Sequence, residues 1–338
     1  MWSTQKLRSS VRHPEWVVDL AMSSLIDPSD TIVITGFWRS GTTWLLESMA
    51  SSLQAKSVFE PLHLSISSYR DTLRKSIREQ PDSYLCLFMP YVEDAERRDA
   101  AELRQYTLRA LNSSIPGFWV RRGRTNEGNA WMKRAGRVFS RFRDAFRTRV
   151  VTKLVRGQLL ISALQSWFDP IIVHLRRDPR AIVPSFDRSF SNWWHYLSLE
   201  EQPLETNDGR SSYFSTWTDE IKRIDEDDRV ARLAAYWALT ERFVQDVENS
   251  GLVSLSYERL CREGENYLCQ RLNPFFEEAP VWTLQGDSAT TFGNRRRSTL
   301  KKRIYGWKKE LDTQTIAKIE EVVGIFGMSS NLSSHCYS

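Results

Sequence analysis

A glycine-bounded loop near the start of the chain carries the residues with the clearest chemistry. Gly36 and Gly41 are separated by four residues, and Thr42 and Thr43 follow directly. This spacing is the frame of a Walker A loop, G-x-x-x-x-G-K-[ST], whose backbone N–H groups cradle phosphates. Thr42 stands where that motif has its lysine, and the positive charge lies inside the loop, at Arg39. The spacing therefore predicts a cradle for a phosphate or sulfate, without the lysine that serves the β- and γ-phosphates of ATP.

The residues on either side of this loop predict a strand and a helix. Residues 31–35 form a β-branched run that is typical of a strand buried on both faces, and residues 42–53 place apolar side chains at helical spacing. This layout brings the unpaired N–H groups and the partial positive charge of a helix start to the loop. The alternative is a turn whose glycines serve only packing, but Arg39 and the two threonines favour anion binding.

A second strand end has the same character. Residues 171–177 form an apolar run that ends in Arg177, and Pro179 follows where a helix can begin. Because proline suits the first position of a helix, we expect a helix whose first turn is free to bind an anion. Two such sites in one sheet indicate a ligand with two separated phosphates. His174, inside the apolar run, is interpreted as a core residue.

Two further polar residues lie in the stretch 56–63, which predicts a second short strand ended by proline. Glu60 and His63 lie on either side of Pro61, which ends that strand. Because the ends of strands carry the ligands of a doubly wound sheet, both residues are candidates for the site. The alternative for Glu60 is a solvated carboxylate at a strand end.

The remaining patterns complete an alternation of strands and helices. Apolar runs predict strands at residues 149–156 and 252–257, and amphipathic patterns predict helices at 158–167, 229–247 and 312–326. This order predicts an α/β fold: a P-loop-type doubly wound sheet, with a mainly parallel five-stranded core and helices on both faces.

Two segments stand apart within the single domain expected for residues 1–338, whose core is placed at about 30–330. Residues 121–149 are basic, with apolar residues at near-helical spacing. They predict a helical insertion with either a solvated basic face or a surface for an anionic acceptor. Residues 186–228 are rich in aromatic residues and predict a long irregular loop on the acceptor side. Its rings suit either stacking on a sugar or a local hydrophobic lid.

The composition excludes several classes. The chain has 338 residues, 41% of them apolar, and a net charge of +5, which suits an anionic ligand without indicating nucleic acid. Its four cysteines form no C-x-x-C pair, so neither a disulfide framework nor a zinc site is expected. No apolar run approaches the ~20 residues of a membrane span, and no signal peptide is recognised. We expect a cytoplasmic protein, either a monomer or a homodimer.

These motifs resemble the sulfotransferase family that uses 3′-phosphoadenosine 5′-phosphosulfate (PAPS) as its donor. The stretch 38–44 is similar to the family's 5′-phosphosulfate loop. Residues 177–185 resemble its 3′-phosphate motif, in which an arginine and a serine bind the phosphate. Residues 256–258 resemble its Tyr-Glu-Asp strand end, and parts of 290–308 look like its C-terminal donor-binding region.

The resemblance implies which residues hold the donor. Residues 59–61 and 174–180, with an arginine at position 39, look closest to the carbohydrate 6-O-sulfotransferase branch. Cationic side chains would cover the charge of PAPS and of its product, adenosine 3′,5′-bisphosphate, so no metal is expected. The implied donor-binding residues are Arg39, Ser40, Gly41, Thr42, Thr43, Trp44, Arg177, Ser185, Tyr257, Thr290, Phe292, Arg297, Lys301 and Lys302.

One departure from the family concerns the catalytic base. Aryl and alcohol sulfotransferases carry a Lys-Thr-His element on the third strand, and its histidine is the base; here Lys153 is present, but valine stands at the base position. Several glycan-modifying relatives use a glutamate after the second strand, which makes Glu60 the first choice. His63 and His195 are the alternatives. The resemblance gives Arg39 and Lys153 the task of stabilising the leaving phosphate.

The sequence leaves more than one possibility for the acceptor and for the class of protein. The acceptor is predicted to be a glycan or a small natural product, sulfated on a hydroxyl or an amine. A P-loop kinase of a small molecule is a rival class, against which the missing Walker lysine argues. A non-enzymatic polyanion binder, using the basic stretches 121–149 and 295–309, is the other. No nucleic-acid partner is expected.

Overall fold

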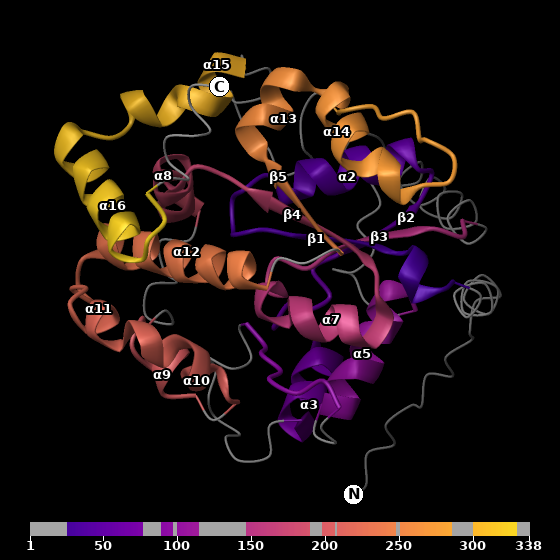
Figure 1. Ribbon diagram of the computed structural model, residues 1–338, viewed down its shortest axis with the longest axis horizontal. Helices are drawn as coiled ribbons and strands as arrows, with labels where there is room; N and C mark the ends of the chain where they lie inside the picture. Colours follow the sequence, from indigo (N-terminus) through magenta and orange to yellow (C-terminus); the bar gives the residue numbers. More distant parts are fainter. Residues whose placement is uncertain are drawn as a thin grey trace, which may run out of the picture.

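Five parallel strands form the centre of the structure (Figure 1). The computed structural model describes residues 26–76, 89–96, 100–114, 147–189, 198–206, 208–247, 251–285 and 300–329. The strands are β1 (Ile32–Thr35), β2 (Lys56–Phe59), β3 (Val150–Lys153), β4 (Ile171–Arg176) and β5 (Leu252–Ser256), in the spatial order β2-β3-β1-β4-β5. Every adjacent pair runs parallel. The prediction of an α/β fold with a five-stranded parallel core is confirmed.

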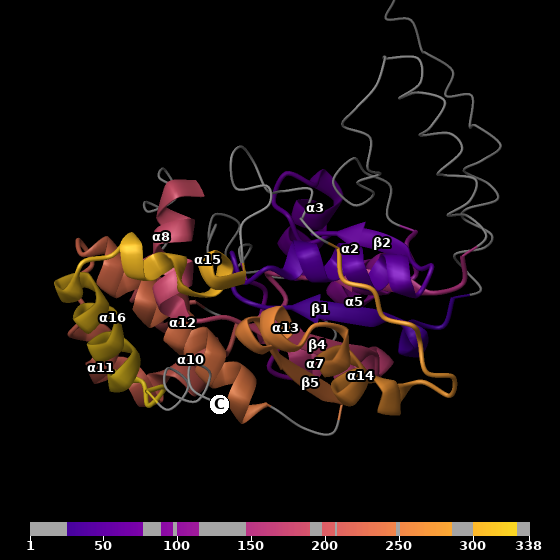
Figure 2. The ribbon, with the colours of Figure 1, turned by 90° about the horizontal axis from the view of Figure 1, so that it is seen from above.

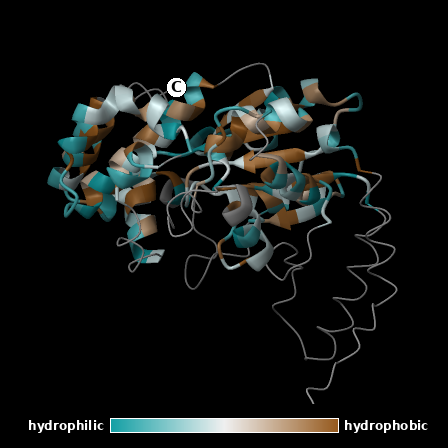
Figure 3. Ribbon diagram, turned by 90° about the horizontal axis from the view of Figure 1, so that it is seen from below, coloured by the Kyte–Doolittle hydropathy of each residue, from teal (hydrophilic) through white to brown (hydrophobic). Residues whose placement is uncertain are grey.

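Helices cover both faces of the sheet, and successive residues of a strand point to opposite layers. Ile32 and Ile34 of β1 pack in one apolar cluster with residues of α2 (Thr42–Ser52), α13 (Tyr257–Glu263) and α14 (Glu265–Leu272). Val33, between them, packs in the cluster of the other layer. Because both faces are covered, the strands are largely apolar, and much of their length is brown in Figure 3.

The second layer is built from α3 (Ser67–Ser76), α5 (Ala101–Leu111), α7 (Ile161–Phe168), α8 (Pro179–Ser189), α12 (Arg229–Asp246) and α16 (Thr313–Ile325). Helices α12 and α16 lie side by side in both views (Figures 1 and 2). Shorter elements are η1 (Pro28–Asp30), η3 (Gln158–Leu160), η5 (Ser215–Trp217), η6 (Asn273–Phe275), α15 (Leu300–Tyr305) and η8 (Gly306–Lys309). The C-terminal elements thus pack onto the sheet that begins near the N-terminus.

The prediction of a long irregular loop at residues 186–228 is wrong for the described part of that segment. After α8 the chain forms α9 (Glu201–Leu204), α10 (Arg210–Phe214), η5 and α11 (Thr218–Lys222). Two of its aromatic rings pack on long helices and their ends: Tyr213 lies 5.0 Å from Phe243, and Trp217 lies 5.8 Å from Phe326, between ring centroids. These contacts leave both rings partly buried against the core, and the segment forms short helical turns.

Some predicted features lie outside the described residues. The structure describes the chain up to Ser114 and again from Arg147, so most of the basic insertion predicted at 121–149 is not covered. The same holds for residues 190–197, which include His195. In the described part of the chain, none of the helices has the length and apolar character needed to traverse a bilayer.

Candidate active site

The carboxyl ends of the strands bring the predicted residues to one edge of the sheet. β1 lies between β3 and β4. The segments that follow these strands therefore meet at the centre of the edge, where open α/β sheets bind their ligands. The loop at 36–41 follows β1, and Arg177 follows β4. Glu60 follows β2, which pairs with the edge of β3 that faces away from β1.

The two glycines of the loop are required by close approach as well as by backbone conformation. Gly36 has φ 149° and Gly41 has φ 97°, in the region that favours glycine. A Cβ at Gly36 would lie 2.5 Å from the carbonyl oxygen of Leu175, and one at Gly41 would lie 2.7 Å from Cε2 of Tyr257. Gly41 is the N-cap residue of α2 and has no side chain, so no side chain accepts from the first N–H groups of this helix.

Arg39 joins the loop to the strand end that was predicted as a second anion site. Its φ is 71°, a left-handed conformation that costs a side-chain-bearing residue about 1–2 kcal/mol. Its Nε donates to Oγ of Ser185 at 3.1 Å, and its carbonyl oxygen accepts from Nη1 of Arg177 at 2.8 Å. The structure therefore brings together three residues that the sequence motifs place in two separate segments.

The prediction that the first turn of the second helix binds an anion is wrong. Helix α8 does begin at Pro179, but Oδ1 of Asp178 accepts from the backbone N of Arg180 at 2.8 Å. A carboxylate therefore already caps this helix start and opposes a second negative charge there. An anion at this strand end would instead meet the side chains of Arg177 and Ser185.

Lys153 and Glu60 form a buried ion pair beside the loop. Nζ of Lys153 lies 3.0 Å from Oε1 of Glu60 and donates to Oγ1 of Thr43 at 2.8 Å. On the other side, Nη1 of Arg156 lies 3.4 Å from Oε2 of Glu60. Glu60 is only 6% exposed and has φ 50°. The reading of Glu60 as a solvated carboxylate is therefore wrong, because both of its oxygens face buried cations.

The strand register explains this pair. Phe59 of β2 is paired with Lys153 of β3, and the backbone N of Glu60 donates to the carbonyl of Lys153 at 3.1 Å. The ammonium group also lies 4.2 Å from the ring centroid of Phe59, within the range of a cation–π contact. Burial lowers the pKa of Lys153, although the Glu60 carboxylate acts against that shift.

His63 lies close enough to this cluster to feel its charges. Burial lowers the pKa of His63 to about 4, and the positive charges of Arg156 and Lys153 act in the same direction, while Glu60 opposes them. Its Nδ1 is 2.7 Å from Oγ of Ser65. The half-buried imidazole is therefore neutral at pH 7 and adds no charge to the Lys153–Glu60–Arg156 cluster.

Two aromatic residues form one side of the site. Trp44 and Tyr257 meet edge to face, with ring centroids 5.9 Å apart and an interplanar angle of 71°. The guanidinium carbon of Arg177 lies 4.4 Å from the Tyr257 ring centroid, and Nε1 of Trp44 donates to the carbonyl of Gln285. Burial raises the pKa of Tyr257, so its hydroxyl stays protonated.

Two buried polar atoms at the site lack a protein partner. Oγ of Ser40 and Nε of Arg177 are buried and make no hydrogen bond to any residue that the structure describes. Buried polar groups are normally paired, so such atoms at the ends of the strands suit a ligand with oxygen atoms. His174, by contrast, is the predicted core residue: it is fully buried, with one ring nitrogen 2.9 Å from Oγ1 of Thr35 and the other 3.0 Å from Glu241.

The C-terminal candidates are covered only in part. Thr290, Phe292 and Arg297 lie outside the described residues, and Lys301 and Lys302 lie on α15, where their side chains are not described. The backbone of α15 nevertheless reaches the site, because the carbonyl of Arg303 accepts from Nη2 of Arg177 at 3.2 Å.

Sequence patterns missed two residues of this region. Arg156 is buried against Glu60, and its three-residue spacing from Lys153 after a buried strand was the available signal. Trp38 was noted only as part of the loop; its ring packs on Phe37, Phe186 and Tyr236, at centroid distances of 5.0, 6.4 and 6.5 Å. Trp38 therefore anchors the loop in the second helix layer.

Comparisons with known proteins add little to this geometry. No protein-family model matches the chain, and no curated protein matches its sequence. Among solved structures, the chain is similar to a sulfotransferase domain from the curacin biosynthetic pathway, with 15% sequence identity and a TM-score of 0.38. The match covers 86% of this chain and 96% of that domain. A likeness at this level assigns neither an activity nor a substrate to the chain.

Proposed function

We propose that this chain is a single-domain, PAPS-dependent sulfotransferase, which transfers a sulfuryl group to a hydroxyl or an amine of an acceptor. The observation that supports this most is the contact between the two segments predicted to bind phosphates. Arg39 donates to Ser185, and Arg177 donates to the carbonyl of Arg39. One ligand with two anionic groups would meet all three residues at once.

The residues present fit this donor. Arg39, Ser40 and the uncapped start of α2 at Thr42 and Thr43 would hold the 5′-phosphosulfate. Arg177 and Ser185 would hold the 3′-phosphate, and Trp44 and Tyr257 would flank the adenine. The unpartnered Oγ of Ser40 and Nε of Arg177 support this assignment. When bound, the donor would supply the activated sulfuryl group.

The chain's own groups have distinct tasks in this proposal. Glu60 would accept the proton of the acceptor, and Arg39 and Lys153 would neutralise the charge that builds on the departing phosphate. Lys153 suits this task because it lies between Thr43 and Glu60 and so links the phosphate side of the site to the base. Sulfuryl transfer resembles phosphoryl transfer, in which positioning and electrostatics supply most of the catalysis.

The proposed acceptor is a glycan or a small natural product. A carbohydrate 6-O-sulfotransferase is the narrower version, supported by the motifs at residues 59–61 and 174–180. A transfer screen with labelled PAPS across glycans, phenols and amines tests it. Labelled product from no acceptor class, together with tighter binding of ATP–Mg than of adenosine 3′,5′-bisphosphate, would replace the proposal with a small-molecule kinase.

Replacement of Glu60 tests the catalytic assignment. We expect Glu60→Gln to lower kcat by about 10²–10⁴-fold, because the amide keeps the shape but accepts no proton. Binding of adenosine 3′,5′-bisphosphate, measured by calorimetry, should stay within about threefold of the wild type, a difference below 1 kcal/mol.

The matched control for that variant is Glu277→Gln, since Glu277 is exposed and lies in another part of the chain. It should leave kcat unchanged. Full turnover in Glu60→Gln would exclude Glu60 as the base, and His63→Ala and His195→Ala would then identify which histidine accepts the proton.

A further inference from the structure

The first turn of α13 lies between the two segments that the proposed function assigns to the donor. The Tyr257 ring fills the space in front of Gly41, where a Cβ would lie 2.7 Å from its Cε2. The same ring lies under the guanidinium group of Arg177. A residue that fixes this turn can therefore act on both anion-binding segments.

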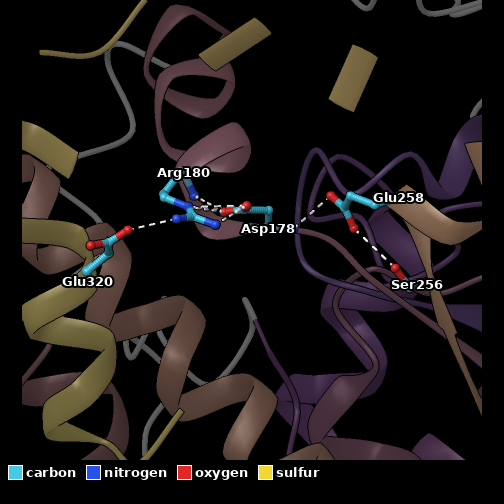
Figure 4. A network of polar contacts seen from close by, with 5 residues as sticks. All are labelled: Asp178, Arg180, Ser256, Glu258 and Glu320. Carbon is cyan, nitrogen blue, oxygen red and sulfur yellow. Dashed lines mark hydrogen bonds and ion pairs between the residues drawn. The ribbon is translucent and has the colours of Figure 1, made fainter. Parts of the chain in front are cut away.

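Glu258, the next residue of this turn, is a buried carboxylate that the proposed function does not use. It is 2% exposed. Its Oε1 accepts from the backbone N of Asp178 at 3.1 Å, and its Oε2 accepts from Oγ of Ser256 at 3.3 Å (Figure 4). Burial raises the pKa of Glu258, and the nearby carboxylate of Asp178 acts in the same direction.

The bond to Asp178 fixes the peptide group that follows Arg177. Because this N–H belongs to the peptide between Arg177 and Asp178, holding it limits the main-chain rotation that aims the Arg177 side chain. The negative charge of Glu258 cannot itself help to bind a phosphate, since like charges repel. Its charge also attracts the Arg177 guanidinium, so the effect of the hydrogen bond has to be separated from that of the charge, which Glu258→Gln removes.

The other side of Asp178 is held independently. Its carboxylate accepts two hydrogen bonds from Nε and Nη2 of Arg180, at 3.0 and 2.7 Å to the nearer oxygens, and caps α8 through the backbone N of Arg180. Nη1 of Arg180 donates to Glu320 of α16 at 2.7 Å (Figure 4), and its guanidinium lies 4.4 Å from the Trp307 ring centroid. The side chain of Asp178 is thus clamped without Glu258, which leaves Glu258 the specific task of holding the 177–178 peptide.

We infer that Glu258 is a positioning residue for nucleotide selection: its hydrogen bond to Asp178 holds Arg177 where the guanidinium meets a 3′-phosphate. The ligand class it selects is an adenosine nucleotide that carries both a 3′- and a 5′-phosphate, over one that carries the 5′-phosphate alone. This inference rests on the proposed function, because Arg177 acts on the 3′-phosphate only if such a donor binds.

The test measures the preference for the 3′-phosphate. Calorimetry gives the Kd of the full chain for adenosine 3′,5′-bisphosphate and for adenosine 5′-monophosphate, in the wild type, Glu258→Ala and Glu258→Gln. We expect Glu258→Ala to lose about tenfold or more of the preference for the bisphosphate, the effect of one hydrogen bond to a charged group. Its affinity for the monophosphate should change less than about twofold.

Glu258→Gln should keep the preference, since its amide oxygen can still accept from Asp178 and the opposing charge is gone. Glu263→Ala is the matched control, because Glu263 lies on the same helix, forms an ion pair with Arg259 and is partly exposed. It should leave both Kd values unchanged.

Three results would overturn the inference. An equal loss of affinity for both nucleotides in Glu258→Ala would mean a general structural role. A loss of preference in Glu258→Gln as large as in the alanine variant would exclude the hydrogen bond as the cause. If Glu258→Ala does not fold, Glu258→Asp, whose shorter side chain does not reach Asp178, should lose the preference; an unchanged preference there would refute the inference.

A different result would show that the proposed function itself is wrong. The wild type would then show no preference for the bisphosphate over the monophosphate, whatever stands at position 258. A wild-type preference that no Glu258 variant alters would leave the proposed donor in place and remove only the role of Glu258.

Discussion

Two residues with predicted catalytic tasks, Arg39 and Glu60, have the left-handed backbone conformation that side-chain-bearing residues rarely adopt. Such strain persists only where surrounding contacts over-determine it, and it clusters at functional sites. The contacts are present here: Arg39 is held by Ser185 and Arg177, and Glu60 by Lys153 and Arg156. Gln54, Ser113 and Asp169 also have positive φ, so the backbone agrees with the motifs at Arg39 and Glu60 without selecting these two by itself.

A pair of variants at Arg39 separates activity from strain. Arg39→Ala and Arg39→Gly should both abolish transfer, because each removes the guanidinium. Since glycine adopts φ 71° without a steric penalty, the glycine variant should be about 1 kcal/mol more stable than the alanine variant. Urea unfolding and a transfer assay measure the two effects.

Retained transfer in either Arg39 variant would remove Arg39 from the mechanism. A glycine variant less stable than the alanine variant would show that the observed backbone conformation carries no strain. The comparison is internal, because both variants lose the same contacts to Ser185.

At the scale of elements, the loop and the first turn of α13 fit closely together. Helix α2 begins at Gly41, and the Tyr257 ring of α13 occupies the space that a side chain at Gly41 would need. The spacing of Gly36 and Gly41 could be read from the sequence. The partner that makes the second glycine necessary could not, because it comes from a strand end far along the chain.

Replacement of two glycines separates backbone strain from this close approach. Gly327→Ala has φ 71° and would place its Cβ 3.7 Å from Nη1 of Arg242, an ordinary contact, so it should cost about 1 kcal/mol of strain alone. Gly41→Ala adds a clash with the Tyr257 ring and should cost about 1–3 kcal/mol more. Urea unfolding gives both values, and equal losses would mean that the Tyr257 ring moves aside without cost.

At the scale of the whole molecule, a buried polar chain joins the sheet to the second helix layer. Glu241 of α12 is fully buried and lies within hydrogen-bond distance of His174 and Arg176 of β4, while His174 also contacts Thr35, the last residue before the loop. The start of the loop is thus tied, through β4, to the long helix behind the sheet. This arrangement supports a site whose rigidity comes from the helix layer as well as from the loop.

The same carboxylate makes stability depend on pH. Burial raises the pKa of Glu241, but the charges and hydrogen bonds of His174 and Arg176 outweigh it and lower the pKa from 4.5 to about 2. The folded pKa lies below the unfolded one, so the stabilisation is complete above about pH 4.5 and is lost as the pH falls toward 2. This contribution amounts to about 3 kcal/mol.

Urea unfolding of the wild type and Glu241→Gln at pH 7 and pH 3 measures the contribution of Glu241 to the free energy of unfolding. The variant should be about 3–5 kcal/mol less stable at pH 7, because a buried cation loses its partner. It should also lose less stability than the wild type between the two pH values. Glu277→Gln, at an exposed position, is the control and should match the wild type. Equal acid losses in the wild type and Glu241→Gln would contradict the prediction.

The sequence alone determined the features that short stretches encode. The apolar runs predicted all five strands, the glycine spacing predicted the loop between β1 and α2, and Pro179 marked the start of α8, because each depends on residues close together in the chain. Tertiary structure decided which side chains meet. Lys153 and Arg156 form ion pairs with Glu60, and the aromatic segment after α8 forms short helices that pack on α12. The Asp178 carboxylate caps the start of α8. Those outcomes depend on strand register and on helix packing between distant parts of the chain, and local patterns carry no information about either.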